Sequence, residues 1–291
     1  MHSPACLLHL SARKLLLSVG ALVFFACRAE GALMLITATH DAVLYEDASG
    51  GSANGGGDYL LAGRTNQSIG SRRRTVLAFD LASIPPETTI ISAAVQLQAL
   101  AVATTSEVLS LHRLLASWTT AHSDPAGNES AGVAALLGDA TWLYSSYPST
   151  TWAVPGGDHT PVASANLEVG PLGGAMMWSS PAMTADVQAW LNNPSTNHGW
   201  LLRSNETTPQ TAKRFISASN LDPALRPVLM IEYRIIPEPS STLTAMGAFS
   251  LLLWSRRRYQ AFLTIVSDAD CPSRTSAAPH RQTDTSSTVG W

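Results

Sequence analysis

Four carboxylates lie close together near the start of the chain, at Asp41, Glu46, Asp47 and Asp58. Paired carboxylates can cleave a glycosidic bond, because one acts as general acid while the other acts as base or nucleophile at a set separation. The same side chains also cap turns. No second cluster answers them elsewhere in the sequence. We therefore assign no catalytic residue and expect a non-catalytic protein, with a polysaccharide-active glycosidase or lyase as the alternative.

The segment EDASGGSANGGGD, residues 46–58, offers hard oxygen ligands at Asp47, Asn54 and Asp58. Calcium prefers such ligands on a flexible backbone, so a structural calcium ion is one interpretation. The segment lacks the spacing of an EF-hand, and the histidines show no spacing typical of zinc ligands. A plain hairpin loop without a cofactor is the favoured prediction, and each histidine is expected to act alone.

Aromatic residues are concentrated in an irregular stretch, residues 117–181. Aromatic faces stack on sugar rings, and nearby polar groups fix the orientation of the sugar. The candidate carbohydrate-binding residues are Trp142, Trp152, Trp178, Lys213 and Arg214, the last two being suited to an acidic glycan. The alternative for each tryptophan is core packing.

Composition limits the function classes. The chain has 291 residues, of which 45% are hydrophobic, enough for a sizeable core. Residues 33–236 carry 16 acidic and 10 basic side chains, a net charge of −6. An acidic body argues against nucleic-acid binding, which needs clustered Lys and Arg. Residues 28–270 contain no cysteine, which excludes disulfides from this part of the chain.

Short runs with alternating apolar and polar residues predict β-strands. In the run from 93 to 102, Val95, Leu97 and Ala99 share one face while Gln96 and Gln98 share the other. The other predicted strands cover 42–46, 59–63, 75–81, 108–115, 199–203, 214–219 and 227–235. One helix is expected in MTADVQAWLNNP, with Thr184 as its N-cap. The predicted fold is all-β, an antiparallel jelly-roll-like sandwich with one short helix, flanked by an N-terminal signal helix and a C-terminal hydrophobic sorting helix. The stretch 117–181 is expected to be loop over a sandwich face.

The amino end predicts a signal peptide over residues 1–32. Arg13 and Lys14 precede the apolar run 15–26, and small residues follow it. This order is typical of secretory signals, so the protein is expected to be exported. Lipidation at Cys27 is the alternative.

The carboxyl end carries three features in a fixed order: Pro237, Glu238 and Pro239, then an apolar run over 243–254, then Arg256, Arg257 and Arg258. This order resembles the PEP-CTERM sorting signal of Gram-negative bacteria, here over residues 237–258. The resemblance implies an exosortase-type membrane protease as partner, transient anchoring of a transmembrane helix in the inner membrane, and release to the cell surface or the extracellular matrix. Residues 259–291 extend beyond the usual end of such signals and are predicted to be a disordered tail.

A second resemblance covers the body. The segment from His40 to Gln98, with RTVLAFDLASIPP at its centre, resembles the opening of a DNRLRE domain, and later segments follow in the same order. The resemblance implies that residues 33–236 form a β-sandwich related to carbohydrate-binding modules. It also implies extracellular polysaccharide, including acidic polysaccharide, as the binding partner. A purely structural matrix protein is the remaining alternative.

Overall fold

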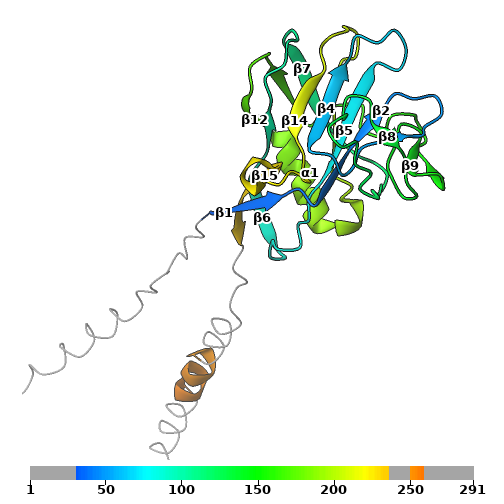
Figure 1. Cartoon of the computed structure of the whole chain (residues 1–291). Helices are drawn as coiled ribbons and strands as arrows, with labels where there is room; N and C mark the ends of the chain where they lie inside the picture. Colours follow the sequence, from blue (N-terminus) through cyan, green and yellow to red (C-terminus); the bar gives the residue numbers. More distant parts are fainter. Residues whose placement is uncertain (1–30, 236–249, 259–291) are drawn as a thin grey trace, which may run out of the picture. The chain divides into compact units, whose positions relative to one another are not determined.

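The computed structural model describes residues 31–235 and 250–258, and it shows a mostly β protein built on one large antiparallel sheet (Figure 1). Eleven strands form this sheet in the order β1-β15-β6-β14-β4-β5-β13-β7-β11, with β12 beside β6 and β2 beside β5. Two ribbons of two strands each, β3 with β8 and β9 with β10, complete the described strands. The bounds are β1 Ala32–Thr37, β2 His40–Tyr45, β3 Ser52–Ala53, β4 Tyr59–Arg64, β5 Arg72–Ala78, β6 Thr88–Ala99, β7 Glu107–Arg113, β8 Val133–Ala134, β9 Tyr144–Ser146, β10 Thr150–Thr151, β11 Ala165–Val169, β12 Gly174–Ser179, β13 Trp200–Ser204, β14 Lys213–Ile216 and β15 Val228–Ile235.

All eight predicted strands are present, with ends shifted by a few residues. The alternation in β6 is confirmed, because Val95, Leu97 and Ala99 are buried. Strand β1 was not predicted. The expectation that residues 117–181 are loop throughout is wrong, because the ribbon strands β8, β9 and β10 form in its first part and the longer strands β11 and β12 form in its last part. Both strands are short, with glycines and a proline between them, so their pattern resembles irregular sequence.

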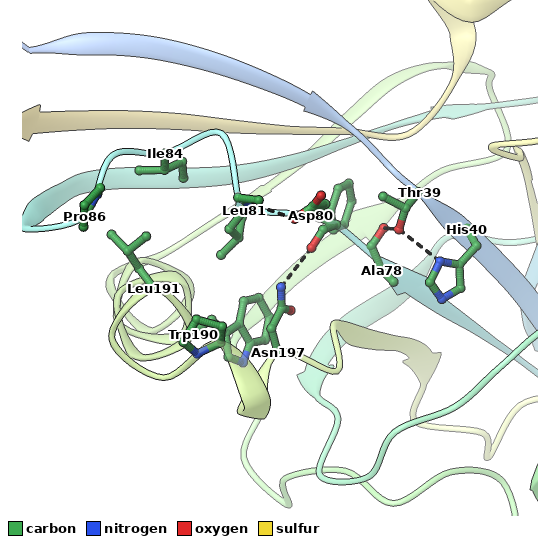
Figure 2. Close-up of a pocket in the computed structure, with 13 residues that line it drawn as sticks. Thr39, His40, Ala78, Asp80, Leu81, Ile84, Pro86, Trp190, Leu191 and Asn197 are labelled. Carbon is green, nitrogen blue, oxygen red and sulfur yellow. Dashed lines mark hydrogen bonds between the residues drawn. The ribbon is translucent and has the colours of Figure 1, made fainter.

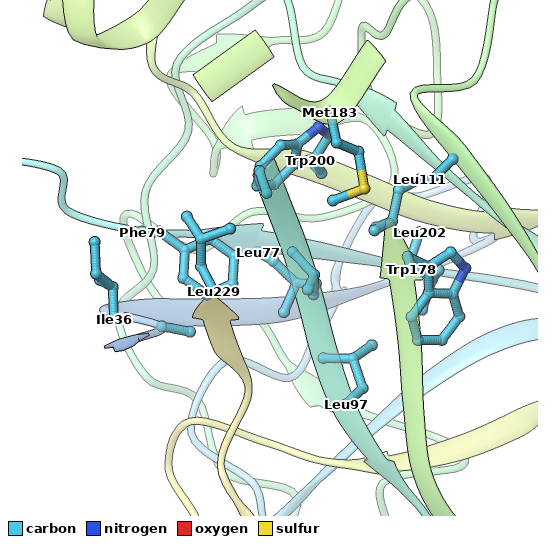
Figure 3. Close-up of a cluster of buried hydrophobic side chains, with 14 of the residues drawn as sticks. Ile36, Leu77, Phe79, Leu97, Leu111, Trp178, Met183, Trp200, Leu202 and Leu229 are labelled. Atoms are coloured by element: carbon cyan, nitrogen blue, oxygen red, sulfur yellow. The ribbon is translucent and has the colours of Figure 1, made fainter. Parts of the chain in front are cut away.

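The main hydrophobic core draws side chains from both halves of the strand order. Leu97 of β6 and Leu229 of β15 belong to the same buried cluster as Leu111 of β7 and Leu202 of β13 (Figure 3). Trp178 of β12 lies in this cluster as well. Strands that are far apart in the strand order therefore bury their apolar faces against one another. Since residues 28–270 contain no cysteine, the stability of this region depends on such packing.

The single long helix of this region is α1, Pro181–Asn192. Its N-cap is Ser180, whose Oγ accepts from Met183 N at 3.0 Å, so the predicted cap at Thr184 is wrong. Pro181 occupies the first turn, where its missing N–H costs nothing, and this moves the start of the helix back from Thr184. Side chains of Met183 and other residues on one face are buried, each such burial contributing roughly 1.5–3 kcal/mol.

A glutamine fixes α1 against β6. The Gln188 Nε2 atom donates to Thr88 O at 3.1 Å, and Ile90 N donates to Gln188 Oε1 at 2.9 Å. Asp186 on the same helix accepts from Trp200 Nε1 at 3.1 Å. These bonds hold the helix beside the start of β6 and beside β13. The 3₁₀ turns η1 (Pro194–Thr196) and η2 (Pro223–Leu225) lie in later connections.

The first part of the irregular stretch covers one face of the sheet, as predicted. Trp118, Trp142 and Trp152 form a second buried cluster with strand residues that include Leu44 and Leu201. Residues on either side of Leu44 belong to the main core instead, as alternation along a strand requires. The sheet is thus covered on two faces in this region.

By its internal contacts the chain divides into the units Met1–Ile236 and Pro237–Trp291. The predicted signal peptide up to residue 30, Pro237, Glu238, Pro239 and the predicted tail lie outside the described residues. Residues 250–258 form an exposed helix, in which Arg258 lies over the Trp254 ring at 4.2 Å. Among the described helices, none combines the length and the hydropathy needed to span a membrane.

Candidate functional site

The three candidate tryptophans are core residues. Trp178 is fully buried, and its Nε1 donates to Leu109 O at 2.9 Å. Trp152 is also buried, and its Nε1 donates to Thr141 O at 2.9 Å. Trp142 packs in the second cluster. None of these rings presents a free face, so this arrangement offers no platform on which a sugar could stack.

Lys213 and Arg214 point to opposite sides of β14, as neighbours in a strand do. Lys213 is buried, and its Nζ donates to Thr104 Oγ1 at 2.9 Å and to Thr105 O at 2.6 Å. Burial lowers the pKa of this ammonium group. Arg214 is half-buried and lies over the Tyr59 ring at 5.3 Å. The five candidate binding residues therefore do not converge on one surface.

Two of the three candidate calcium ligands, Asp47 and Asn54, accept hydrogen bonds from within their own loop. Partial burial opposes ionisation of Asp47, but hydrogen bonds from Ser49, Ser52 and the backbone lower its pKa overall. Asn54 Oδ1 accepts from a backbone N–H three residues later, and Asp58 is exposed. Over residues 31–235 and 250–258, no group of three or more His, Cys, Asp or Glu side chains could hold a metal ion.

The remaining carboxylates of the first segment are also separated from one another. Asp41 is buried, and its Oδ2 accepts from Ala218 N at 2.7 Å. Burial raises its pKa to about 7, although the backbone hydrogen bond opposes this. Glu46 instead accepts from Arg72 N at 3.0 Å. One carboxyl supports the core and the other supports the end of β5.

A compact group of charged side chains lies where β5 and β13 meet. We call Arg72, Arg74, Arg203, Glu206 and His159 the cationic cluster. Arg74 donates twice to Glu206, from Nε to Oε1 at 2.6 Å and from Nη2 to Oε2 at 2.9 Å. Arg203 Nη2 donates to the same Oε2 atom at 3.1 Å, while Arg72 Nε stays 3.7 Å away. Three guanidinium groups thus surround one carboxylate.

The inner members of the cationic cluster are buried and the outer members are accessible. The exposed fraction of the side chain is 7% for Arg74 and 4% for Glu206, but 45% for Arg72 and 23% for Arg203. Burial opposes ionisation of Glu206, yet the hydrogen bonds and charges of the three arginines lower its pKa overall. The carboxylate therefore stays charged. Glu46 also approaches Arg72, at 3.5 Å, and the balance of these charges remains positive.

Two histidines meet beside the cationic cluster, so the expectation of solitary histidines is wrong for this pair. The rings of His112 and His159 lie 5.0 Å apart. His159 Nε2 is 3.3 Å from Arg203 Nη1, and its Nδ1 is 2.7 Å from Gly157 O. Burial lowers the pKa of both rings, and the neighbouring arginines lower it further. Near pH 7 both rings are neutral, and His159 Nε2 can accept a hydrogen bond from Arg203.

Trp142 belongs to this group through its contact with an arginine. Arg74 lies over the Trp142 ring at 4.8 Å, and its Nη1 donates to Gly156 O at 2.7 Å. A Cβ atom at Gly156 would lie 2.5 Å from that Nη1, and the backbone there has a φ of +89°. Glu206 also has a positive φ, +61°, an uncommon conformation for this residue type. The backbone is thus shaped around the Arg74–Glu206 pair.

A pocket of about 440 Å³ lies elsewhere on the same unit, between α1 and the loop that follows β5 (Figure 2). Its apolar wall is formed by Phe79, Leu81, Ile84, Trp190 and Leu191. The volume falls within the usual range of small-molecule sites, roughly 300–1,000 Å³.

Polar groups line one end of this pocket. Asn197 Nδ2 donates to Phe79 O at 2.9 Å, as Figure 2 shows. Thr39 Oγ1 lies 3.0 Å from His40 Nδ1 and donates to Ala78 O at 3.2 Å. Burial lowers the pKa of His40, and His122 lowers it further, so the ring is neutral near pH 7.

No protein-family model matches the chain, and no curated protein is significantly similar to it. Function must therefore be argued from the sites themselves.

Sequence reasoning missed the cationic cluster. The run of Arg72, Arg73 and Arg74 is too short to indicate nucleic-acid binding, yet the two-residue alternation of a strand places the first and third side chains on one face. Arg203 interrupts an apolar strand, WLLRS, which is a further signal. Glu206 lies in a loop after β13, and its pairing with Arg74 across 132 positions has no local signature.

Proposed function

We propose that the protein is an exported, non-catalytic β-sandwich protein that associates with polysaccharide, and that the cationic cluster contacts acidic sugar units. One observation carries this proposal. The side chain of Arg72 is 45% exposed, and the closest contacts of its guanidinium group with carboxylates are 3.5 and 3.7 Å, longer than a hydrogen bond. It can therefore donate to a ligand without breaking a short bond.

The chemistry of the cationic cluster favours a carboxylate ligand. A guanidinium group matches a carboxylate with two parallel hydrogen bonds, and charged bonds of this kind are the stronger ones. Arg74 and Glu206 hold the surrounding positions in place, because both are buried and bonded to each other. Such preorganisation lowers the cost of binding.

The finer fold and the family form part of the same proposal. We propose that the large sheet doubles over into a jelly-roll-like sandwich of the DNRLRE type. The sharing of one core by β6, β7, β13 and β15 supports this, as does the bond from Trp178 of β12 to Leu109 of β7. Sandwiches bury two inner faces against each other in this way.

Binding to acidic polysaccharide tests the proposed function. In affinity gels, we expect the full chain in mild detergent to be retarded by alginate or polygalacturonate but not by dextran. The variant Arg72→Ala/Arg203→Ala is expected to bind at least roughly tenfold more weakly, since hydrogen bonds to charged groups contribute about 1.5–3 kcal/mol each. Added salt is expected to weaken binding of the wild-type protein.

The control is Arg234→Ala, which removes one exposed arginine from β15, outside the cationic cluster, where the test variant removes two from within it. It should bind like the wild type. An equal loss of affinity in the control would mean that binding depends on total charge and not on the cationic cluster. Absence of retardation by every polysaccharide would favour a structural matrix protein, and release of reducing ends or unsaturated sugars would favour an enzyme.

Export and sorting rest on the sequence features at the two ends. We propose that an exosortase-type protease removes the segment after Pro239 and that the product reaches the cell surface or matrix. Intact-mass analysis of the fractionated protein is expected to show a product without the Arg256–Arg258 segment. A full-length protein in the cytoplasm would contradict both parts of this proposal.

A further inference from the structure

The pocket beside α1 carries a different chemistry from the cationic cluster. The residues that line it include one carboxylate, Asp80, and neither lysine nor arginine. Asp80 Oδ1 accepts from Ala82 N at 2.9 Å, and Asp80 is exposed. Among the described residues its Oδ2 atom has no hydrogen-bond partner. A single negative charge therefore stands at the rim of an apolar pocket.

Two further acceptors are free at the same end of the pocket. Asn197 uses its Nδ2 group for Phe79 O, which leaves Oδ1 without a partner among the described residues. Thr39 gives its hydroxyl proton to Ala78 O, so the neutral ring of His40 donates from Nδ1 to Thr39. This assignment leaves His40 Nε2 as an acceptor. Three acceptors call for a ligand with several donors.

One donor of the wall also lacks a partner. The Nε1 atom of Trp190 is buried and has no hydrogen-bond partner in the described structure. A buried N–H group without a partner costs about 1–3 kcal/mol. Trp190 is one of the residues that line the pocket. A ligand with an apolar ring face and hydroxyl groups could pack on this wall and supply the donors that the rim requires.

We propose that this pocket binds an amino sugar, a hydroxylated ring that carries a protonated amine. The apolar face of the ring packs on the wall that contains Trp190 and Leu191. The hydroxyl groups donate to Asn197 Oδ1 and His40 Nε2, and the ammonium group pairs with Asp80 Oδ2. The side chains of Asp80, His40 and Asn197 are drawn at one end of the pocket in Figure 2. The proposal goes beyond the proposed function, because it concerns another site and a ligand of opposite charge.

Calorimetry of the full chain with glucosamine, N-acetylglucosamine and glucose tests this proposal, at a pH where the amine is protonated. Glucosamine is expected to bind roughly twofold to fivefold more tightly than the two neutral sugars, the range for an exposed charge pair. The variant Asp80→Asn keeps an acceptor for Ala82 N and is expected to abolish this preference. The matched control, Asp222→Asn, changes an exposed aspartate that caps a backbone N–H in the same way, at Ala224, and should retain it.

A second variant tests the location. Ala82 is exposed and lines the pocket, so Ala82→Phe fills the mouth without changing the core. We expect this variant to lose glucosamine binding at least tenfold while its melting temperature is unchanged. Equal affinity for glucose and glucosamine, or no binding at all, would overturn the proposal. Binding of tetramethylammonium as tight as that of glucosamine would also overturn it, because no hydroxyl contact would then be in use.

Discussion

Raising the pH from 4 to 8 is expected to reduce the free energy of unfolding by about 4 kcal/mol through one buried carboxyl group, that of Asp41. Burial raises its pKa from an ordinary value of 3.8 to about 7. A difference of this size corresponds to about 4 kcal/mol between the two protonation states. Its single short bond, from Ala218 N, does not offset the loss of water around the charge.

Stability falls with rising pH because the unfolded state loses the Asp41 proton at a lower pH than the folded state. As the pH rises through 4, the unfolded chain releases the proton of Asp41 while the folded protein retains it. The unfolded state then binds fewer protons, so stability falls until the folded carboxyl also ionises near pH 7. Above that pH the contribution is constant. The histidines with lowered pKa act in the opposite direction at pH values below their ordinary pKa of 6.5, because in the folded state they lose protons first.

The variant Asp41→Asn isolates this contribution. Asparagine keeps an acceptor for Ala218 N but does not ionise. The variant should therefore become more stable relative to the wild type as the pH rises from 4 to 7. Urea denaturation at several pH values measures this difference, and the histidine contributions cancel in it. Asp222→Asn, an exposed site, should show no such shift. A constant difference for Asp41→Asn would contradict the raised pKa.

Replacing Glu206 by glutamine is expected to destabilise the protein by about 3–5 kcal/mol. Removal of one partner from a buried ion pair leaves the other charge uncompensated, which is the costly case. Arg74 would keep its place between Trp142 and Gly156 O but lose its carboxylate. The midpoint of urea denaturation should fall with little change in the slope.

Two further variants test whether the unpaired charge of Arg74 causes this loss of stability. Glu168→Gln removes an exposed carboxylate from β11 and should change stability by less than about 0.5 kcal/mol. Arg74→Met/Glu206→Leu removes both members of the innermost pair, and it should be more stable than Glu206→Gln alone, because the buried charge of Arg74 is removed together with its partner. If the double variant were the least stable of all, the unpaired charge would not be the cause of the loss.

The sequence predicted the long strands because their pattern repeats every two residues, as in β6. It predicted the existence of α1 but placed the cap at Thr184 instead of Ser180, since both residue types cap helices and only the position of Pro181 distinguishes them. Strands β11 and β12 were missed because most of their stabilisation comes from pairing with β7 and β6, which is distant in sequence.

The candidate sites were harder to predict than the fold. Tryptophans in an irregular stretch can form either a sugar-binding platform or part of a core. Only the burial of Trp152 and Trp178 in the structure shows that they belong to the core. The cationic cluster depends on Glu206 meeting Arg74 across the sheet, which no spacing rule reveals. The pocket depends on α1 packing beside the loop after β5, and so on tertiary contacts alone.

The bonds between Gln188 and β6 have a consequence for the solubility of the protein. Strand β12 pairs with β6 only from Ala94 onward, so the first residues of β6 extend past it and would form an open edge. Strands of other molecules can pair with such an open edge, and this pairing leads to aggregation. The amide of Gln188 occupies the carbonyl of Thr88 and the N–H of Ile90, the groups that such a strand would need. The helix thus protects the sheet against edge-to-edge association.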